Sequence, residues 1–138
     1  MKAIRSGYKE IQHTADLAIK VWSVTPEGLF AIALEGMYQL MGVSSNILDE
    51  TKKIKIELFS LDLESLLVSF LSECLFFYEI NNWLLIPEEL SIVNNNLIAN
   101  MRIQLIISLD KEIKAVTFHN LEINQKADGL STILIFDV

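Results

Sequence analysis

The segment Ile133-Leu134-Ile135-Phe136-Asp137-Val138 decides the fold. Its run of β-branched and aromatic apolar residues is typical of a buried strand. The last residues of a chain usually fray, but an apolar run of this kind must be covered, so we expect it to be docked in a sheet. A docked strand would hold the carboxylate of Asp137 in a fixed position.

Three earlier segments of the second half are also strand-like, namely residues 90–93, 97–108 and 113–124. Turn residues separate these segments from one another and from the last strand, at Asn94-Asn95-Asn96, Asp110-Lys111 and Asp128-Gly129. The pattern predicts a series of antiparallel hairpins that ends in the C-terminal strand.

Two helices are predicted in the first half. The first begins with Thr25 as N-cap and Pro26 at the first helical position, and Gly42 is suited to end it. The second begins at Ser60 or Asp62, carries a wide apolar face and ends at Asn81-Asn82. Because Leu75 and Phe76 fall outside that face, we expect the second helix to be covered on most sides.

Strands are expected at residues 8–13, 17–24 and 53–58, and the polar residues 44–49 are expected to form a loop. No linker, repeat or low-complexity tract divides the chain, so residues 1–138 are expected to form a single domain. The elements predict an α+β fold in which two main helices pack on a mixed, mostly antiparallel sheet.

The chain is acidic, with 11 basic and 18 acidic residues and a net charge of −7. Nucleic-acid binding draws much of its affinity from basic side chains on phosphates, so we expect no tight binding to RNA by this protein alone. The only dense basic run, Lys52-Lys53-Ile54-Lys55, is interpreted as the solvated start of a strand. The charge instead suits a cation site or a basic protein partner.

No apolar run approaches the ~20 residues that span a bilayer, and no signal peptide is recognised, so we expect a cytoplasmic protein without a membrane partner. The single cysteine, Cys74, excludes an internal disulfide. It lies on the apolar face of the second helix, so it is interpreted as a buried, unreactive thiol. Trp22 and Trp83 are interpreted as packing residues.

The remaining candidates for chemistry are His13 and Asp16 near the start, Asp137 at the end, and the segment 112–119. Strand alternation in this segment separates two faces, with Ala115, Thr117 and His119 on one and Lys114, Val116 and Phe118 on the other. Taken alone, each candidate is compatible with a hydrogen-bonded structural group as well as with a shared functional site.

Four segments together resemble the archease family. They are His13-Thr14-Ala15-Asp16, residues 62–73 of the second helix, Glu112-Ile113-Lys114-Ala115-Val116-Thr117-Phe118-His119, and Phe136-Asp137-Val138. Each motif is short, but the four occur in the family's order and cover nearly the whole chain. The family fold is a small α+β domain, which agrees with the fold class predicted above.

The resemblance implies a protein cofactor and not an enzyme. Archeases assist the tRNA-splicing RNA ligase, which joins RNA ends through a guanylylated histidine, by promoting its guanylylation and its multiple turnover. The family carries a divalent cation, and here the resemblance implies Asp16, Asp137 and Val138 as its ligands. Oxygen ligands suit Ca²⁺, and also Mg²⁺ or Mn²⁺. Residues implied near the site or the partner are His13, Lys114, Thr117 and His119.

Two other classes of function remain open. One is a stand-alone metal-dependent hydrolase in which Asp16 and Asp137 hold the cation and His13 or His119 acts as base. Neither a nucleophile nor a second metal cluster supports this hypothesis in the sequence. The other is a chaperone-like or structural interaction domain, which the hydrophobic content of 51% allows.

Overall fold

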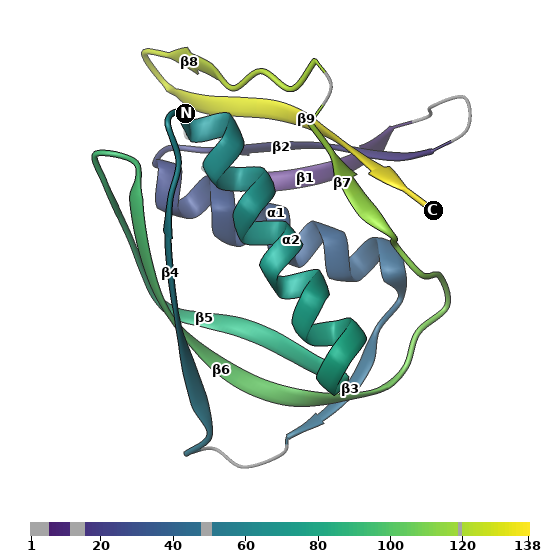
Figure 1. Ribbon diagram of the computed structural model, residues 1–138. Helices are drawn as coiled ribbons and strands as arrows, with labels where there is room; N and C mark the ends of the chain where they lie inside the picture. The colour runs from purple at the N-terminus through teal and green to yellow at the C-terminus, as the bar shows by residue number, and fades with distance from the viewer. Residues whose placement is uncertain (1–5, 12–15, 48–50, 119) are drawn as a thin grey trace, which may run out of the picture.

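A computed structural model describes residues 6–11, 16–47, 51–118 and 120–138. Two helices pack against two antiparallel sheets (Figure 1). The first sheet contains β1 (Gly7–Ile11), β2 (Leu17–Ser23), β7 (Ala115–Thr117), β8 (Asn124–Lys126) and β9 (Gly129–Asp137). The second sheet contains β3 (Ser44–Ile47), β4 (Lys53–Phe59), β5 (Trp83–Val93) and β6 (Asn96–Ser108).

The helices are α1 (Pro26–Met41) and α2 (Leu63–Asn81). Thr25 caps α1 by accepting the N–H of Gly28 at 3.0 Å, and Gly42 ends the helix with a φ of 63°. Asp62 caps α2 in the same way, and this hydrogen bonding lowers the pKa of its carboxyl. Asn82 ends α2 in the left-handed conformation. The predicted starts and ends of both helices are therefore confirmed.

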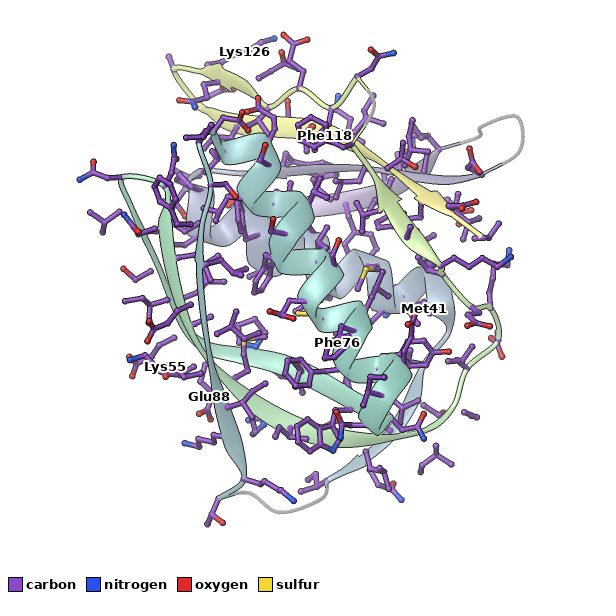
Figure 2. All side chains as sticks on the ribbon, in the orientation of Figure 1. Met41, Lys55, Phe76, Glu88, Phe118 and Lys126 are labelled. Carbon is purple, nitrogen blue, oxygen red and sulfur yellow. The ribbon has the colours of Figure 1, made fainter. Side chains whose placement is uncertain are left out.

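The core forms where the helices meet both sheets. Helix α1 packs on β1, β2 and β5, and α2 packs on β4, β5 and β7. Phe30 of α1 and Phe70 of α2 are fully buried, with ring centroids 5.9 Å apart. Leu75 is buried as expected, but Phe76 is 50% exposed, so the prediction that α2 is covered on most sides holds only in part (Figure 2).

The C-terminal strand is docked as predicted. β9 pairs with β2 on one side and with β7 and β8 on the other, all antiparallel. Its residues alternate, so that Leu134 and Phe136 are fully buried while Ile133 and Asp137 are exposed. Burial on one face and pairing on both edges explain why this segment does not fray.

Several predicted strands were wrong in detail. Residues 44–47 form β3 instead of a loop, and β5 already begins at Trp83. The turn at Asp110-Lys111 was expected to join a hairpin, but it connects the two sheets, because β6 belongs to the second sheet and β7 pairs with β9 in the first. The expected single sheet is thus two sheets, and every registered strand pair is antiparallel.

Candidate functional site

Asp137 lies at the end of β9, in the middle of the first sheet. The strand pairs Asp137 with Ala115 of β7, and the N–H of Lys114 donates to the carbonyl of Asp137 at 2.8 Å. The backbone of Asp137 is therefore held by pairing, while its side chain lies on the exposed face of the sheet.

Asp16 lies directly before β2, on the other side of β9. The register pairs Leu17 with Phe136, and continuing it by one residue on each strand places Asp16 opposite Asp137. Directly opposed residues of antiparallel strands have Cα atoms about 4.5–5.5 Å apart and point their side chains to the same face. The fold thus brings together two carboxylates that are 121 positions apart in the sequence (137 minus 16).

The other site candidates fall into two groups. Val138 follows Asp137 and is 39% exposed, and Thr117 is half-buried and pairs with Ile135, two residues before Asp137 on the same face. Lys114 is exposed and precedes β7, so the strand alternation that was expected to place it with the buried Val116 does not extend to it. His13 and His119 lie outside the described residues.

The chemistry of the acidic pair suits a hard divalent cation. Like charges at directly opposed strand positions destabilise a sheet, and a cation between the carboxylates would relieve that repulsion. Within the ranges that the structure describes, no group of three or more His, Cys, Asp or Glu side chains is placed to hold a metal. Asp16 and Asp137 would therefore supply only part of a coordination shell.

Exposed apolar side chains occur on the same two strands as Asp137 and its partner Ala115, although only Val138 adjoins the acidic pair. Ile133, Phe118 and Val138 are 48%, 49% and 39% exposed, and Figure 2 shows Phe118 where β7 ends beside β9. Contiguous exposed apolar patches mark protein-binding surfaces, whereas apolar residues exposed singly are common on any protein.

Cys74 is fully buried, and burial raises the pKa of its thiol. This confirms the interpretation of Cys74 as a packing residue. Trp83 is also a packing residue, because its ring stacks on Phe77 with centroids 5.8 Å apart. Neither described helix is long and apolar enough to cross a membrane.

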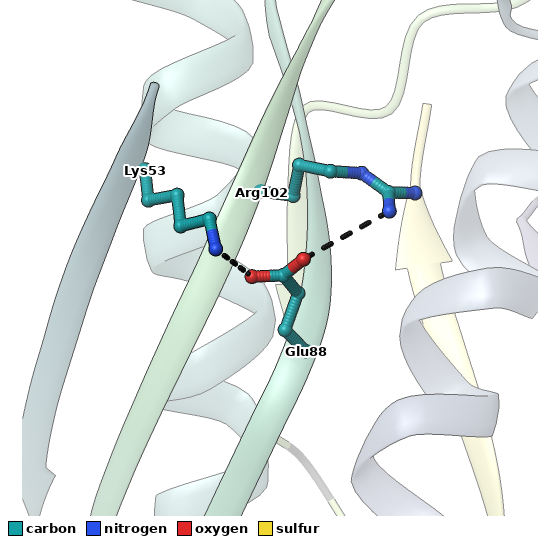
Figure 3. A network of polar contacts seen from close by, with 3 residues as sticks. All are labelled: Lys53, Glu88 and Arg102. Atoms are coloured by element: carbon teal, nitrogen blue, oxygen red, sulfur yellow. Dashed lines mark ion pairs between the residues drawn. The ribbon is translucent and has the colours of Figure 1, made fainter. Parts of the chain in front are cut away.

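The basic run at residues 52–55 forms the start of β4, as predicted. Lys53 and Arg102 are opposed on β4 and β6. Oε1 of Glu88 lies 2.8 Å from Nζ of Lys53, and its Oε2 lies 3.9 Å from Nη1 of Arg102 (Figure 3). These two cations lower the pKa of Glu88, chiefly through its hydrogen bond with Lys53. The run is therefore partly neutralised within the protein.

A different basic surface was missed by the sequence analysis. Lys9, Lys20 and Lys126 come from β1, β2 and β8 and line one hollow together with Trp22. Their separation along the chain hides the cluster, and the only local signal is the alternation that places Lys20 and Trp22 on one face of a strand.

Comparisons with known proteins agree with this fold. The model of the archease protein family matches residues 8–138. A protein archease from Methanosarcina barkeri is 32% identical, and the match covers 95% of each chain.

Two solved structures have the same fold. The solution structure of protein 1598 from Methanobacterium thermoautotrophicum has a TM-score of 0.74 at 22% identity and covers 96% of this chain and 99% of the other. A crystal structure of a Thermotoga maritima archease, described as a possible chaperone, has a TM-score of 0.68 at 23% identity over the full length of both chains. The match of the family model over nearly the whole sequence and the 32% identity with the Methanosarcina barkeri protein show that the chain belongs to the archease family.

Proposed function

We propose that this protein is a non-catalytic cofactor of a tRNA-splicing RNA ligase, and that it promotes guanylylation and multiple turnover of that ligase through a cation-binding acidic site. Membership of the archease family supports a protein cofactor or chaperone-like role. The observation that carries the finer proposal is the register of β2 and β9, which sets Asp16 against Asp137 at the exposed end of a central strand.

The acidic pair would hold the cation, with an oxygen of Val138 as a further ligand. Ca²⁺ takes six to eight oxygen ligands, so a cation on so few protein groups keeps open positions for water or for an oxygen of the partner. When bound, the cation would supply positive charge at the tip of β9. Ca²⁺ is the expected ion, with Mg²⁺ or Mn²⁺ as alternatives.

The remaining side chains around the pair would contact the ligase. Val138 offers apolar area beside the carboxylates, and Ile133 and Phe118 offer more of it farther along β9 and past the end of β7. Lys114 offers an exposed cation whose backbone is tied to Asp137. A protein interface of this kind gains affinity from apolar contacts and orientation from the charged groups.

The test is a ligase guanylylation and turnover assay with and without this protein. The variants Asp16→Asn and Asp137→Asn should lose activation, because each amide keeps the size of the side chain but removes a charged ligand. Glu89→Gln is the matched control, since Glu89 is an exposed carboxylate of β5 on the other sheet. Full activation by both aspartate variants, in folded protein, would contradict the proposal.

The same assay separates the other classes of function. A hydrolase would turn over a substrate without ligase and would lose that activity with Asp137→Asn. A chaperone-like protein would raise the yield of active ligase equally in the wild type and in both aspartate variants. A cofactor raises the rate of folded ligase and depends on both carboxylates.

A further inference from the structure

Three lysines and one tryptophan gather on the outer face of the first sheet. Lys9 of β1, Lys20 and Trp22 of β2, and Lys126 of β8 line a hollow of about 810 Å³ together with the turn that joins β8 to β9. The hollow also contains one acid, Asp128, so its lysines and acid sum to a charge of +2 (three minus one) in a protein of net charge −7.

Two of these lysines are directly opposed. The register of β1 and β2 pairs Lys9 with Lys20, and like charges in opposed strand positions destabilise a sheet. In the part of the chain that the structure describes, no carboxylate lies within ion-pair distance of Lys9, Lys20 or Lys126.

The second sheet shows how this protein otherwise treats such a pair. Lys53 and Arg102 are also opposed, and there the irregularity of β5 at Pro87–Glu89 presents Glu88 to both cations (Figure 3). The second sheet therefore supplies a counter-ion to its opposed cations. The described part of the first sheet supplies none to Lys9 and Lys20, so an anion from another molecule could bind there.

Trp22 indicates which kind of anion fits. Its ring lies across Gly7, the opposed residue on β1, with ring atoms 2.7–3.3 Å from the position that a Cβ of Gly7 would take. Because Gly7 has no side chain, the indole occupies this space, where it is half-buried and forms part of the hollow, so the interpretation of Trp22 as a packing residue holds only in part. An accessible aromatic ring beside lysines is the arrangement by which proteins bind single-stranded nucleic acid, with a base stacked on the ring and phosphates on the cations.

We propose that this hollow binds a single-stranded nucleic acid segment, with one base on Trp22 and phosphates at Lys9, Lys20 and Lys126. The site is separate from the acidic pair, because four residues of extended strand, about 13 Å, lie between Asp16 and Lys20, and six residues, about 20 Å, lie between Asp16 and Trp22. The affinity should be weak, with a dissociation constant of about 10⁻⁴ to 10⁻⁶ M, because three cations act against an acidic protein. This agrees with the expectation that the protein alone does not bind RNA tightly.

The experiment uses the Trp83→Phe protein, in which Trp22 is the only tryptophan, and titrates it with a short oligouridylate while following tryptophan fluorescence. We expect quenching of Trp22 and a plot of log affinity against log salt with a slope of about −2, which is the value for three phosphate contacts on a single strand. Trp22→Leu in otherwise wild-type protein should weaken binding about 5- to 150-fold, measured by anisotropy of labelled oligouridylate.

The decisive comparison is between two triple variants of equal charge. Lys9→Gln, Lys20→Gln and Lys126→Gln together should abolish the salt dependence and the binding. Lys52→Gln, Lys55→Gln and Lys111→Gln together remove the same charge from other surfaces and should bind nearly as the wild type does. Figure 2 shows Lys126 at the top of the view and Lys55 lower down, at the left side of the molecule.

Three results would overturn the proposal. The first is equal loss of affinity in the two triple variants, which would mean that binding follows net charge alone. The second is binding of polyglutamate as tight as that of oligouridylate, which would make the hollow a site for acidic protein. The third is that Trp22→Leu binds oligouridylate as tightly as the wild type and as Trp22→Phe, the variant that keeps an aromatic ring. Thermal melting must show that both variants are folded.

Discussion

Replacing Asp137 with asparagine should stabilise the metal-free protein, which is the opposite of what a structural carboxylate would show. The register sets Asp137 against Asp16 on one face of the first sheet, where Asp137 is exposed and Asp16 is half-buried. Removing one of two opposed negative charges relieves repulsion, while the amide keeps the shape of the side chain and the backbone pairing with β7.

The expected gain follows from the spacing of the strands. Two unit charges about 5 Å apart in water repel by about 0.8 kcal/mol, and measured values for exposed pairs lie at about 0.2–1 kcal/mol. We therefore expect about 0.5 kcal/mol of stabilisation. For a chain of 138 residues this raises the melting temperature by about 2 °C.

The cation should reverse the order of the melting temperatures of the wild type and Asp137→Asn. A ligand present at about 100 times its dissociation constant stabilises the folded state by about 2.7 kcal/mol, or about 9 °C for this chain. Wild-type protein should gain this increment in Ca²⁺, while Asp137→Asn should lose most of it. The assay is thermal melting by circular dichroism in chelator and in Ca²⁺, with Glu89→Gln as the control for a general effect of net charge.

A structural carboxylate predicts the other sign. Groups left unpaired by its loss would cost about 1–3 kcal/mol, so the variant would melt several degrees lower in chelator. That result, together with a wild-type protein whose melting does not respond to Ca²⁺, Mg²⁺ or Mn²⁺, would refute both the repulsion and the cation site.

Three further predictions concern the rest of the fold. Tyr38→Phe should destabilise the protein by about 1–3 kcal/mol in denaturant melts, because the N–H of Leu85 donates to the Tyr38 hydroxyl at 3.1 Å and would lose its partner. Cys74 should react with a thiol reagent only as fast as the protein unfolds, since the side chain is fully buried and its thiol pKa is raised; rapid reaction of native protein would contradict this. Glu88→Gln should destabilise the protein at neutral pH. The difference from wild type should begin to shrink as pH falls below the ordinary carboxyl pKa of 4.5 and should vanish only below the lowered pKa of the folded protein, because the stability that a lowered pKa adds is lost as pH falls through that pKa.

The sequence by itself determined the local elements that have local causes. Thr25 and Asp62 begin the helices because their side chains accept N–H groups three residues ahead, and Gly42 and Asn82 end them because these residues tolerate a positive φ. The burial of Cys74 followed from its place on an apolar helical face.

The arrangement of the site depends both on local motifs and on the register of the strands. Short motifs at the ends of the chain were sufficient to suggest that Asp16 and Asp137 belong to one site. Their proximity, however, is a property of the register between β2 and β9, which pairs residues more than 100 positions apart. The division of the strands into two sheets was equally hidden, because an apolar strand has the same local pattern in either sheet.

Only the tertiary structure could reveal the lysine surface. Lys9, Lys20 and Lys126 are single charges in three strands, and the sequence around each gives no sign of the others. The dense basic run at residues 52–55 is visible in the sequence, and in the fold Glu88 is the counter-ion of its Lys53. Charge on a sheet surface is assembled by strand pairing between distant segments, so local sequence determines which residues are exposed but not which of them become neighbours.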